Sequence, residues 1–264
     1  MASANFSDLK ARVLSAIVMV AVGAFAIWWG GVVFAALAIA LSGLMAWELY
    51  AMMQPDAPQG RAEAHGVSTA ILVGVLSFTL GGWLSLAGLA LGAVVLSMRL
   101  TRDKGIFGAY LLMILFAGHG LIVLRDAFGL GFVLWLVGIV IASDVAGYFA
   151  GRILGGPKFW PRISPKKTWS GTVAGWICAA LVGVTFAVLM DLSWVVVPVS
   201  ALLALAGQLG DIAESFIKRR MGVKDSSNLI PGHGGVLDRF DALIAVASLA
   251  LILAMLGAFS GLAG

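Results

Sequence analysis

The feature that most constrains this chain is a series of long apolar segments that contain almost no charged side chains. A helix needs about twenty mainly apolar residues to cross the hydrocarbon core of a bilayer. The sequence therefore predicts an all-α, polytopic integral membrane protein with about nine transmembrane helices. The predicted spans are approximately residues 13–29, 32–53, 67–80, 83–98, 106–123, 130–150, 172–190, 195–213 and 242–262.

Composition supports this class, because 61% of the residues are apolar and only 11% are charged. Soluble proteins carry charges on roughly a quarter of their residues. The single cysteine, Cys178, lies in an apolar segment and excludes an intrachain disulfide. The net charge of +4 does not imply a nucleic-acid partner, since Lys and Arg in membrane proteins report orientation first.

The distribution of positive charge predicts the orientation of the chain, because cytoplasmic loops collect Lys and Arg. With the N-terminus in the cytoplasm, sixteen of the 17 Lys and Arg residues fall on the cytoplasmic side and only Arg125 falls outside. The outer turns, near residues 30–31, 81–82, 125–126 and 191, are short, and Gly264 is expected outside. We expect N-terminal transmembrane helices over residues 1–129 and a catalytic transmembrane region with cytoplasmic motif loops over residues 130–264.

One polar segment, residues 215–241, lies between two apolar segments and holds eight charged residues. It combines carboxylates for a divalent cation, basic side chains for phosphate oxygens and a glycine-rich turn that an anion can approach. In the turn, three glycines between Pro231 and Gly235 exclude regular helix or strand. Asp238 and Asp241 follow one helical turn apart, as a second pair of metal ligands would. This segment predicts phosphate chemistry.

Acidic residues inside the spans each need a reason, since an aspartate costs about 2.5 to 3.5 kcal/mol at a helix centre. Asp144, Tyr148 and Arg152 repeat every four residues and predict one polar stripe on a helix. The alternative for this stripe is internal neutralisation of the aspartate by the arginine. For Glu48, beside two aromatic residues, a position at the membrane interface is as well supported as a function.

A second helical face carries Asp211, Glu214, Ser215 and Lys218. Such a face can hold a hard cation through oxygen ligands while its lysine meets an anion. The alternative is a helix end whose lysine and arginines reach to the membrane surface, although this does not explain Asp211. A further polar segment, residues 158–171, includes Ser164, Lys166 and Lys167, and ordinary cytoplasmic charge is its alternative interpretation.

These motifs together resemble those of the phosphatidate cytidylyltransferases, the CDP-diacylglycerol synthases. The longest pattern starts at Ser215 with Lys218 and Arg219, continues through Lys224 and Asp225, and ends with Pro231, Gly232, His233, Gly234, Gly235, Asp238, Arg239 and Asp241. The stripe at residues 143–152 and the run at residues 163–169 resemble two further family motifs. The resemblance covers about the last 125 residues. The chain departs from the family pattern at Ser170, commonly Glu, and at Ala242, often Ser.

The resemblance implies an enzyme that transfers CMP from CTP to phosphatidate, releases pyrophosphate and uses a divalent cation such as Mg²⁺. It implies catalytic roles for Asp211, Asp238, Lys218, Arg239 and Asp144, and metal contacts from Asp211, Asp238, Ser215 and Asp241. The expected substrate-binding residues are Ser164, Lys166, Lys167, Arg219, Lys224, Gly232, His233, Gly234 and Gly235. We expect the bacterial inner membrane as its location, membrane lipids as partners, and a homodimer as one option for its assembly.

Two other functions are open from the residues alone. A CTP-dependent lipid kinase of the polyprenol or phytol type shares membrane helices, basic loops and carboxylates, but it would release CDP in place of pyrophosphate. A transporter also places carboxylates inside the membrane. Against a transporter, the polar residues crowd toward one membrane face, and no repeat relates the two halves of the chain.

Overall fold

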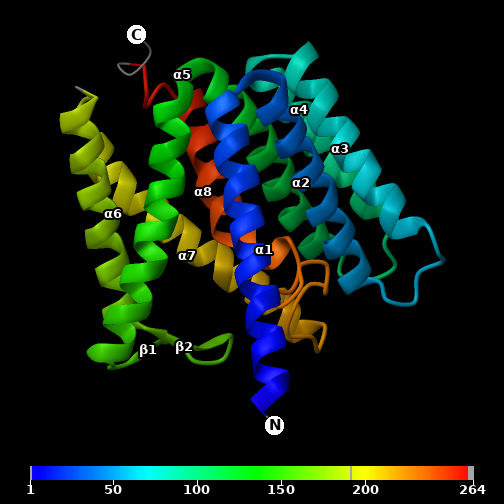
Figure 1. The fold of residues 1–264 in the computed structure, drawn as a ribbon. Helices are drawn as coiled ribbons and strands as arrows, with labels where there is room; N and C mark the ends of the chain where they lie inside the picture. Colours follow the sequence, from blue (N-terminus) through cyan, green and yellow to red (C-terminus); the bar gives the residue numbers. More distant parts are fainter. Residues whose placement is uncertain (1, 191, 261–264) are drawn as a thin grey trace. The chain divides into compact units, whose positions relative to one another are not determined.

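The computed structural model describes residues 2–190 and 192–260 and consists almost entirely of helices (Figure 1). This confirms the all-α class. Within the described residues, six helices are long and apolar enough to cross a membrane. The helices are α1 (Ala2–Trp29), α2 (Gly31–Met53), α3 (Arg61–Thr79), α4 (Gly82–Met98), α5 (Lys104–Ile153), α6 (Trp169–Leu189), α7 (Val196–Arg220) and α8 (Leu237–Met255).

The described part of each predicted span lies largely on a helix, and several of the breaks lie at glycines. α5 covers two predicted spans and is interrupted at Gly129, whose φ of 77° is unfavourable for other residues. The chain also breaks between α3 and α4 at Gly82, which has a φ of 61°. The number of membrane crossings and their direction stay predictions, and Asp191 and Gly264 lie outside the described residues.

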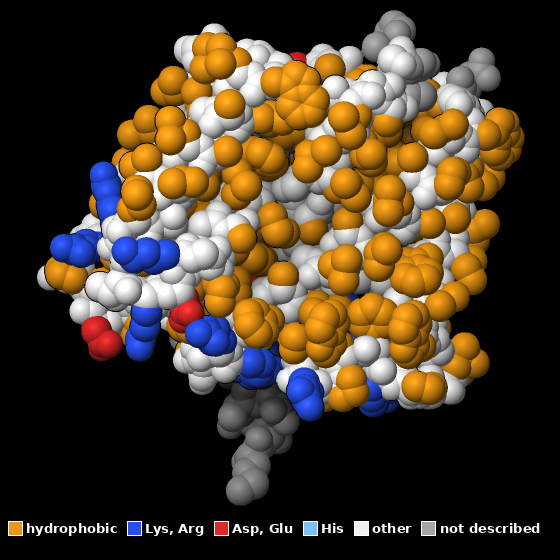
Figure 2. Space-filling model, turned by 180° about the vertical axis from the view of Figure 1, so that it is seen from behind, with side chains coloured by type: hydrophobic (Ala, Val, Ile, Leu, Met, Phe, Trp, Pro, Cys, Tyr) orange, Lys and Arg blue, Asp and Glu red, His pale blue; other side chains and the backbone are white. Residues whose placement is uncertain are grey.

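The surface is that of a membrane protein. Hydrophobic side chains cover most of the surface visible in Figure 2. Large apolar residues such as Val32, Ile153 and Leu189 are more than three-quarters exposed. Water-soluble monomers rarely expose apolar surface on this scale, whereas lipid chains solvate it well.

One local element differs from the sequence prediction. Residues that were expected to form a polar loop contain a short antiparallel hairpin of β1 (Lys158–Trp160) and β2 (Ser164–Thr168). Thr168 then caps α6, because its hydroxyl accepts a hydrogen bond of 3.2 Å from Gly171 N. The hairpin and the cap together fix where Lys166 and Lys167 lie relative to α6.

The chain divides into two compact units. Unit 1 contains the residues up to Ile122 together with Arg220–Phe240, and unit 2 contains Val123–Arg219 with the residues from Asp241 onward. The segment between α7 and α8, which carries most of the sequence motifs, therefore packs with the N-terminal helices. The division at residue 129, which separates the N-terminal transmembrane helices from the expected catalytic region, stays a prediction about function.

Unit 1 is held by close contacts between helices. A Cβ atom at Gly66 of α3 would lie 2.8 Å from the carbonyl oxygen of Gly43 in α2, so glycine allows these helices to touch. Nearby, the rings of Tyr50 and His65 stack with their centroids 3.9 Å apart. At the end of α7, Arg220 donates a hydrogen bond of 2.7 Å to Asp103, which lowers the pKa of this aspartate.

Unit 2 has an equally close contact between α6 and α7. A Cβ atom at Gly183 would lie 2.6 Å from Ser200 Oγ and 2.9 Å from the carbonyl oxygen of Val196. Trp135 of α5 reaches the same place, since its indole N–H donates a hydrogen bond of 2.9 Å to Ser200. Three helices of unit 2 thus meet at one small residue.

We predict that Gly183→Ala destabilises the protein by about 1–3 kcal/mol, the usual cost of forcing extra volume into a packed interior. The measurement is the Tm of the purified protein in detergent. Gly23→Ala is the matched control, because no atom lies within 4 Å of a Cβ at that position of α1. An equal loss of Tm in both variants would contradict the packing described for α6 and α7.

Candidate active site

Unit 2 contains a cavity of about 520 Å³ with a polar lining. Ligand sites in proteins typically enclose about 300–1,000 Å³. Asp144, Tyr148 and Arg152 share this cavity, which confirms the stripe predicted on α5, and Arg152 donates a hydrogen bond of 2.7 Å to the Tyr148 hydroxyl. The lining residues are Ser143, Asp144, Gly147, Tyr148, Gly151, Arg152, Ser164, Lys166, Lys167, Thr168, Gly171, Thr172, Gln208 and Asp211.

Glycines bring the walls of this cavity together. A Cβ atom at Gly171 of α6 would lie 2.5 Å from the carbonyl oxygen of Gly147 in α5, and one at Gly151 would lie 2.8 Å from Thr168 Oγ1. Larger residues at these positions would separate α6 from α5. The glycines of the predicted motifs therefore serve packing, and they place the basic hairpin beside the α5 stripe.

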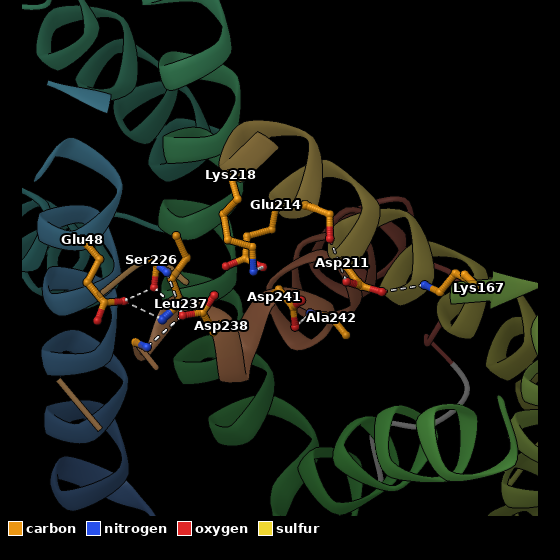
Figure 3. Close-up of polar contacts among 12 residues, drawn as sticks. Glu48, Lys167, Asp211, Glu214, Lys218, Ser226, Leu237, Asp238, Asp241 and Ala242 are labelled. Carbon is orange, nitrogen blue, oxygen red and sulfur yellow. Dashed lines mark hydrogen bonds and ion pairs between the residues drawn. The ribbon is translucent and has the colours of Figure 1, made fainter. Parts of the chain in front are cut away.

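An ion pair in the cavity joins Lys167 to Asp211. Lys167 Nζ lies 2.7 Å from Asp211 Oδ2 (Figure 3). It also donates a hydrogen bond of 3.1 Å to the carbonyl oxygen of Gln208. Ser215 Oγ lies 3.4 Å from the other oxygen of Asp211. Because the Asp211 side chain is 36% exposed, an incoming ligand can reach this ion pair. The structure thus brings together residues that the sequence separates by more than forty positions.

Gln208, a polar residue in an apolar segment, was not singled out from the sequence, and its role was missed. Its Nε2 group donates to Ser143 Oγ and to the carbonyl oxygen of Thr172, both at 3.2 Å. Its Oε1 atom accepts a hydrogen bond of 3.0 Å from the indole of Trp176. Gln208 therefore joins α5, α6 and α7 at the wall of the cavity. An uncharged polar side chain inside a span was the available signal.

The face of α7 that follows Asp211 forms as predicted, but its lysine already has a protein partner. Lys218 Nζ lies 2.5 Å from Glu214 Oε2, and the Glu214 side chain is fully buried. Ser170, one departure from the family pattern, donates a hydrogen bond of 2.5 Å to the carbonyl oxygen of Gly155. The phosphate contact that the sequence predicts for Lys218 therefore stays a prediction.

The donor set of unit 2 suits a hard cation that is shared with a ligand. Asp211 lies on α7 and Asp241 on α8, and these helices approach closely at Gly210, where a Cβ atom would lie 2.7 Å from the carbonyl oxygen of Asp241. Among the described residues, no three acidic, histidine or cysteine side chains converge on one point as a closed metal site would require. Mg²⁺ commonly uses one or two carboxylates and completes its shell with phosphate oxygens and water. Asp211 and Asp241 fit that pattern.

The glycine-rich turn belongs to unit 1 and adopts the irregular backbone that the sequence predicts. Gly232 and Gly234 have φ values of 74° and 84°, and Ile230 pairs with Gly234 in an isolated β-bridge. The His233 ring lies against α1, where its Nδ1 atom is 2.8 Å from Ser15 Oγ. The same hydroxyl lies 3.0 Å from the carbonyl oxygen of Pro231. His233 thus contributes to holding the turn against α1.

Asp238 accepts hydrogen bonds from this loop. Its Oδ2 atom accepts from Ser226 N at 2.8 Å, Ser226 Oγ at 2.9 Å and Gly235 N at 2.8 Å (Figure 3). The N–H group of Gly235 therefore contacts the protein's own carboxylate. The expected substrate contacts of Gly232, His233, Gly234 and Gly235, and those of Arg219, Lys224 and Arg239, stay predictions.

Glu48 is a residue for which the sequence left two interpretations open. Its side chain is completely buried within the protein, so it is not exposed at the membrane surface. The sequence placed an acidic residue in an apolar segment, which was the right signal. The neighbouring Trp47 and Tyr50 suggested an interface, but Tyr50 is itself only 1% exposed.

Comparison with known proteins agrees with the motifs. The model of the cytidylyltransferase family matches residues 10–256, so the chain belongs to this family of nucleotidyltransferases, as the motif resemblance predicts. It is 37% identical over 249 residues to the phosphatidate cytidylyltransferase of Brucella suis, and the match covers 92% of each chain. It is 38% identical over 196 residues to the phosphatidate cytidylyltransferase of Staphylococcus saprophyticus, a match that covers 69% of this chain and 75% of that one.

The cavity predicts a specific role for Lys167. Lys167→Gln removes the ammonium group that pairs with Asp211. It also removes a positive charge that could bind phosphate oxygens, so turnover should fall by about 10²–10³-fold. The KM for CTP should rise as well. Lys158→Gln is the matched control, since this exposed lysine of the same hairpin does not line the cavity. Steady-state kinetics of both variants test this role. If the two variants are equally active, Lys167 contributes only to the positive charge that orients the chain in the membrane.

Proposed function

We propose that this protein transfers CMP from CTP to phosphatidate, forming CDP-diacylglycerol and pyrophosphate at the membrane surface. The observation that carries the proposal is the unit 2 cavity, in which lysine and arginine side chains from β2 and α5 meet carboxylates from α5 and α7. Its volume of about 520 Å³ suits a nucleotide, and a relative that matches 92% of the chain carries this activity in its name. The apolar helices suit a lipid substrate.

In the proposed reaction, a phosphate oxygen of phosphatidate attacks the α-phosphorus of CTP. A new P–O bond forms as the bond between the α-phosphorus and the bridging oxygen breaks, and pyrophosphate leaves with that oxygen. The attacking phosphate monoester has a second pKa of about 6 and is largely ionised at neutral pH. No general base is required. Catalysis then consists of positioning and charge neutralisation.

The ion pair between Lys167 and Asp211 provides a way to bind the triphosphate. We propose that Lys167 leaves Asp211 and contacts phosphate oxygens when CTP enters the cavity. Lys166 and Arg152, which line the same cavity, supply further positive charge, and Ser164 supplies a hydroxyl donor. Asp144 completes the wall, and the Tyr148 hydroxyl orients Arg152 through a hydrogen bond of 2.7 Å.

We propose that Asp211 and Asp241 would hold a divalent cation such as Mg²⁺, with Ser215 supporting Asp211. When bound, such an ion neutralises charge on the triphosphate and on the departing pyrophosphate. Asp238, on α8, stays a proposed catalytic and metal-binding residue, as the motif resemblance implies. Lys218, Arg219, Lys224 and Arg239 are proposed to act on phosphate groups.

We further propose that the motif loops face the cytoplasm of a bacterial cell, in its inner membrane. The support is the bias of Lys and Arg in the sequence, together with the bacterial sources of the relatives. Intracellular CTP is then accessible to the cavity. A homodimer stays one option for the assembly.

One assay tests the function. Purified protein is supplied with CTP labelled at the α-phosphorus, phosphatidate and Mg²⁺, and the lipid extract and the soluble products are both analysed. The proposal expects label in CDP-diacylglycerol and an equal amount of pyrophosphate. Release of CDP with a phosphorylated lipid would establish a lipid kinase, and absence of both products would overturn the proposal.

The absence of a general base predicts different outcomes for His233 and the aspartates. Asp211→Asn and Asp238→Asn should each lower kcat by about 10²–10³-fold, because an electrostatic stabiliser is lost. His233→Gln should cost at most about tenfold, the worth of one hydrogen bond to Ser15. The test is kcat as a function of pH. A wild-type pKa that disappears in an inactive His233→Gln variant would make His233 the base.

A further inference from the structure

Glu48 of α2 makes a set of contacts that the proposed reaction does not yet use. Its Oε1 atom accepts hydrogen bonds from Ser227 Oγ at 2.6 Å and from Val236 N at 2.9 Å. Its Oε2 atom accepts from Leu237 N at 2.7 Å and lies 3.2 Å from Ser226 Oγ (Figure 3). A fully buried carboxylate thus has hydrogen-bond donors at both oxygens, from the loop that joins α7 to α8 and from the first residue of α8.

The two backbone donors explain why a carboxylate is favourable here. α8 begins at Leu237, and the first N–H groups of a helix have no partner within the helix. They also form the positive end of its dipole, which favours a negative group. Glu48 supplies that group from a helix far earlier in the chain. It therefore fixes where α8 begins relative to α2.

The glycine before α8 is explained by the same carboxylate. A Cβ atom at Gly235 would lie 2.6 and 2.7 Å from the two oxygens of Glu48, and it would overlap Ser226 Oγ. Any other residue would displace the carboxylate or the hydroxyl. Gly235 is required by the packing of Glu48 against the loop, in addition to any contact with substrate.

Glu48 also connects to Asp238 through one hydroxyl group. Ser226 Oγ lies 2.9 Å from Asp238 Oδ2 and 3.2 Å from Glu48 Oε2, but a serine hydroxyl has one proton to donate. The backbone N–H of Ser226 holds Asp238 in addition, at 2.8 Å. Moving Glu48 would therefore shift Ser226, and with it the aspartate assigned above to catalysis.

We propose that Glu48 is a positioning residue for the transfer reaction, which holds the loop at residues 226–237 and thereby places Asp238. The proposal rests on the proposed function for its kinetic consequence, but not for the loop contacts. It assigns a role to the N-terminal helices, which carry none of the family motifs. Glu48 acts through the loop, and its carboxylate is not expected to contact CTP or phosphatidate.

Glu48→Gln is the informative substitution, because it preserves the size of the side chain but replaces one of the two acceptor oxygens with an NH₂ group. That NH₂ group would face hydrogen-bond donors of the loop and could not accept from them. The loop should then shift by a fraction of an ångström or more. A misplacement of about 1 Å can cost about 10²-fold in rate. We expect kcat to fall by about 10–10²-fold and the KM for CTP to change by less than about threefold, since the cavity of unit 2 is unchanged.

Two comparisons separate positioning from a general loss of stability. Glu63→Gln, an exposed carboxylate at the start of α3, is the matched control and should retain wild-type kcat. Gly235→Ala keeps Glu48 but displaces it, so it should reproduce the kinetic loss of Glu48→Gln. The double variant should be about as impaired as the worse single variant, because both changes damage one arrangement. If the fold-losses in kcat of the two single variants multiply in the double variant, the proposal is contradicted.

The loop itself can be observed without measuring activity. Val236 is 5% exposed, so a cysteine placed there in a Cys178→Ala background should react slowly with a water-soluble maleimide. Adding Glu48→Gln should accelerate labelling by about tenfold or more, whereas Glu63→Gln should not. Unchanged labelling together with unchanged kcat would overturn the proposal. If the wild-type protein transfers no CMP, the proposed function fails, and the labelling still decides whether Glu48 holds the loop. If Glu48→Gln gives no folded protein, the labelling rate of the cysteine at position 236 is measured in Gly235→Ala. Faster labelling supports the proposal, and unchanged labelling contradicts it.

Discussion

A charged group inside an apolar helix bundle must find a partner, because a bilayer offers no water to solvate it. This constraint shapes both units of the protein. In unit 2, Asp211 is met by Lys167 at 2.7 Å and Glu214 by Lys218 at 2.5 Å. In unit 1, Glu48 is met by hydroxyl and backbone N–H donors at the start of α8. The polar segments of the sequence fold around these carboxylates.

The same constraint accounts for how the protein can bind a highly charged nucleotide. A cavity lined by unpaired cations would be costly in the absence of ligand. Pairing Lys167 with a partly exposed carboxylate avoids that cost, and it leaves both groups available when a triphosphate and a cation arrive together. In the proposed reaction, Lys167 turns to phosphate oxygens and Asp211 becomes available to a cation.

Local sequence patterns predicted the helices and the polar stripes well. The four-residue repeat of Asp144, Tyr148 and Arg152 needs only helical geometry, and the cavity confirms it. The hairpin was missed because strands of three and five residues leave too short a pattern to recognise. Glu48 and Gln208 were underestimated for another reason. Their partners lie on other helices or in a distant loop, and no local periodicity records which segments will meet.

The most direct test of this account is equilibrium binding of CTP in the presence of EDTA, with wild-type protein, Lys167→Gln and Asp211→Asn. Without a divalent cation, Asp211 only competes with phosphate for Lys167. The account therefore predicts that Lys167→Gln weakens CTP binding and that Asp211→Asn strengthens it, by about tenfold in each direction for an interaction of about 1.4 kcal/mol. Weaker binding by Asp211→Asn under these conditions would contradict the exchange of partners on which the proposed reaction depends.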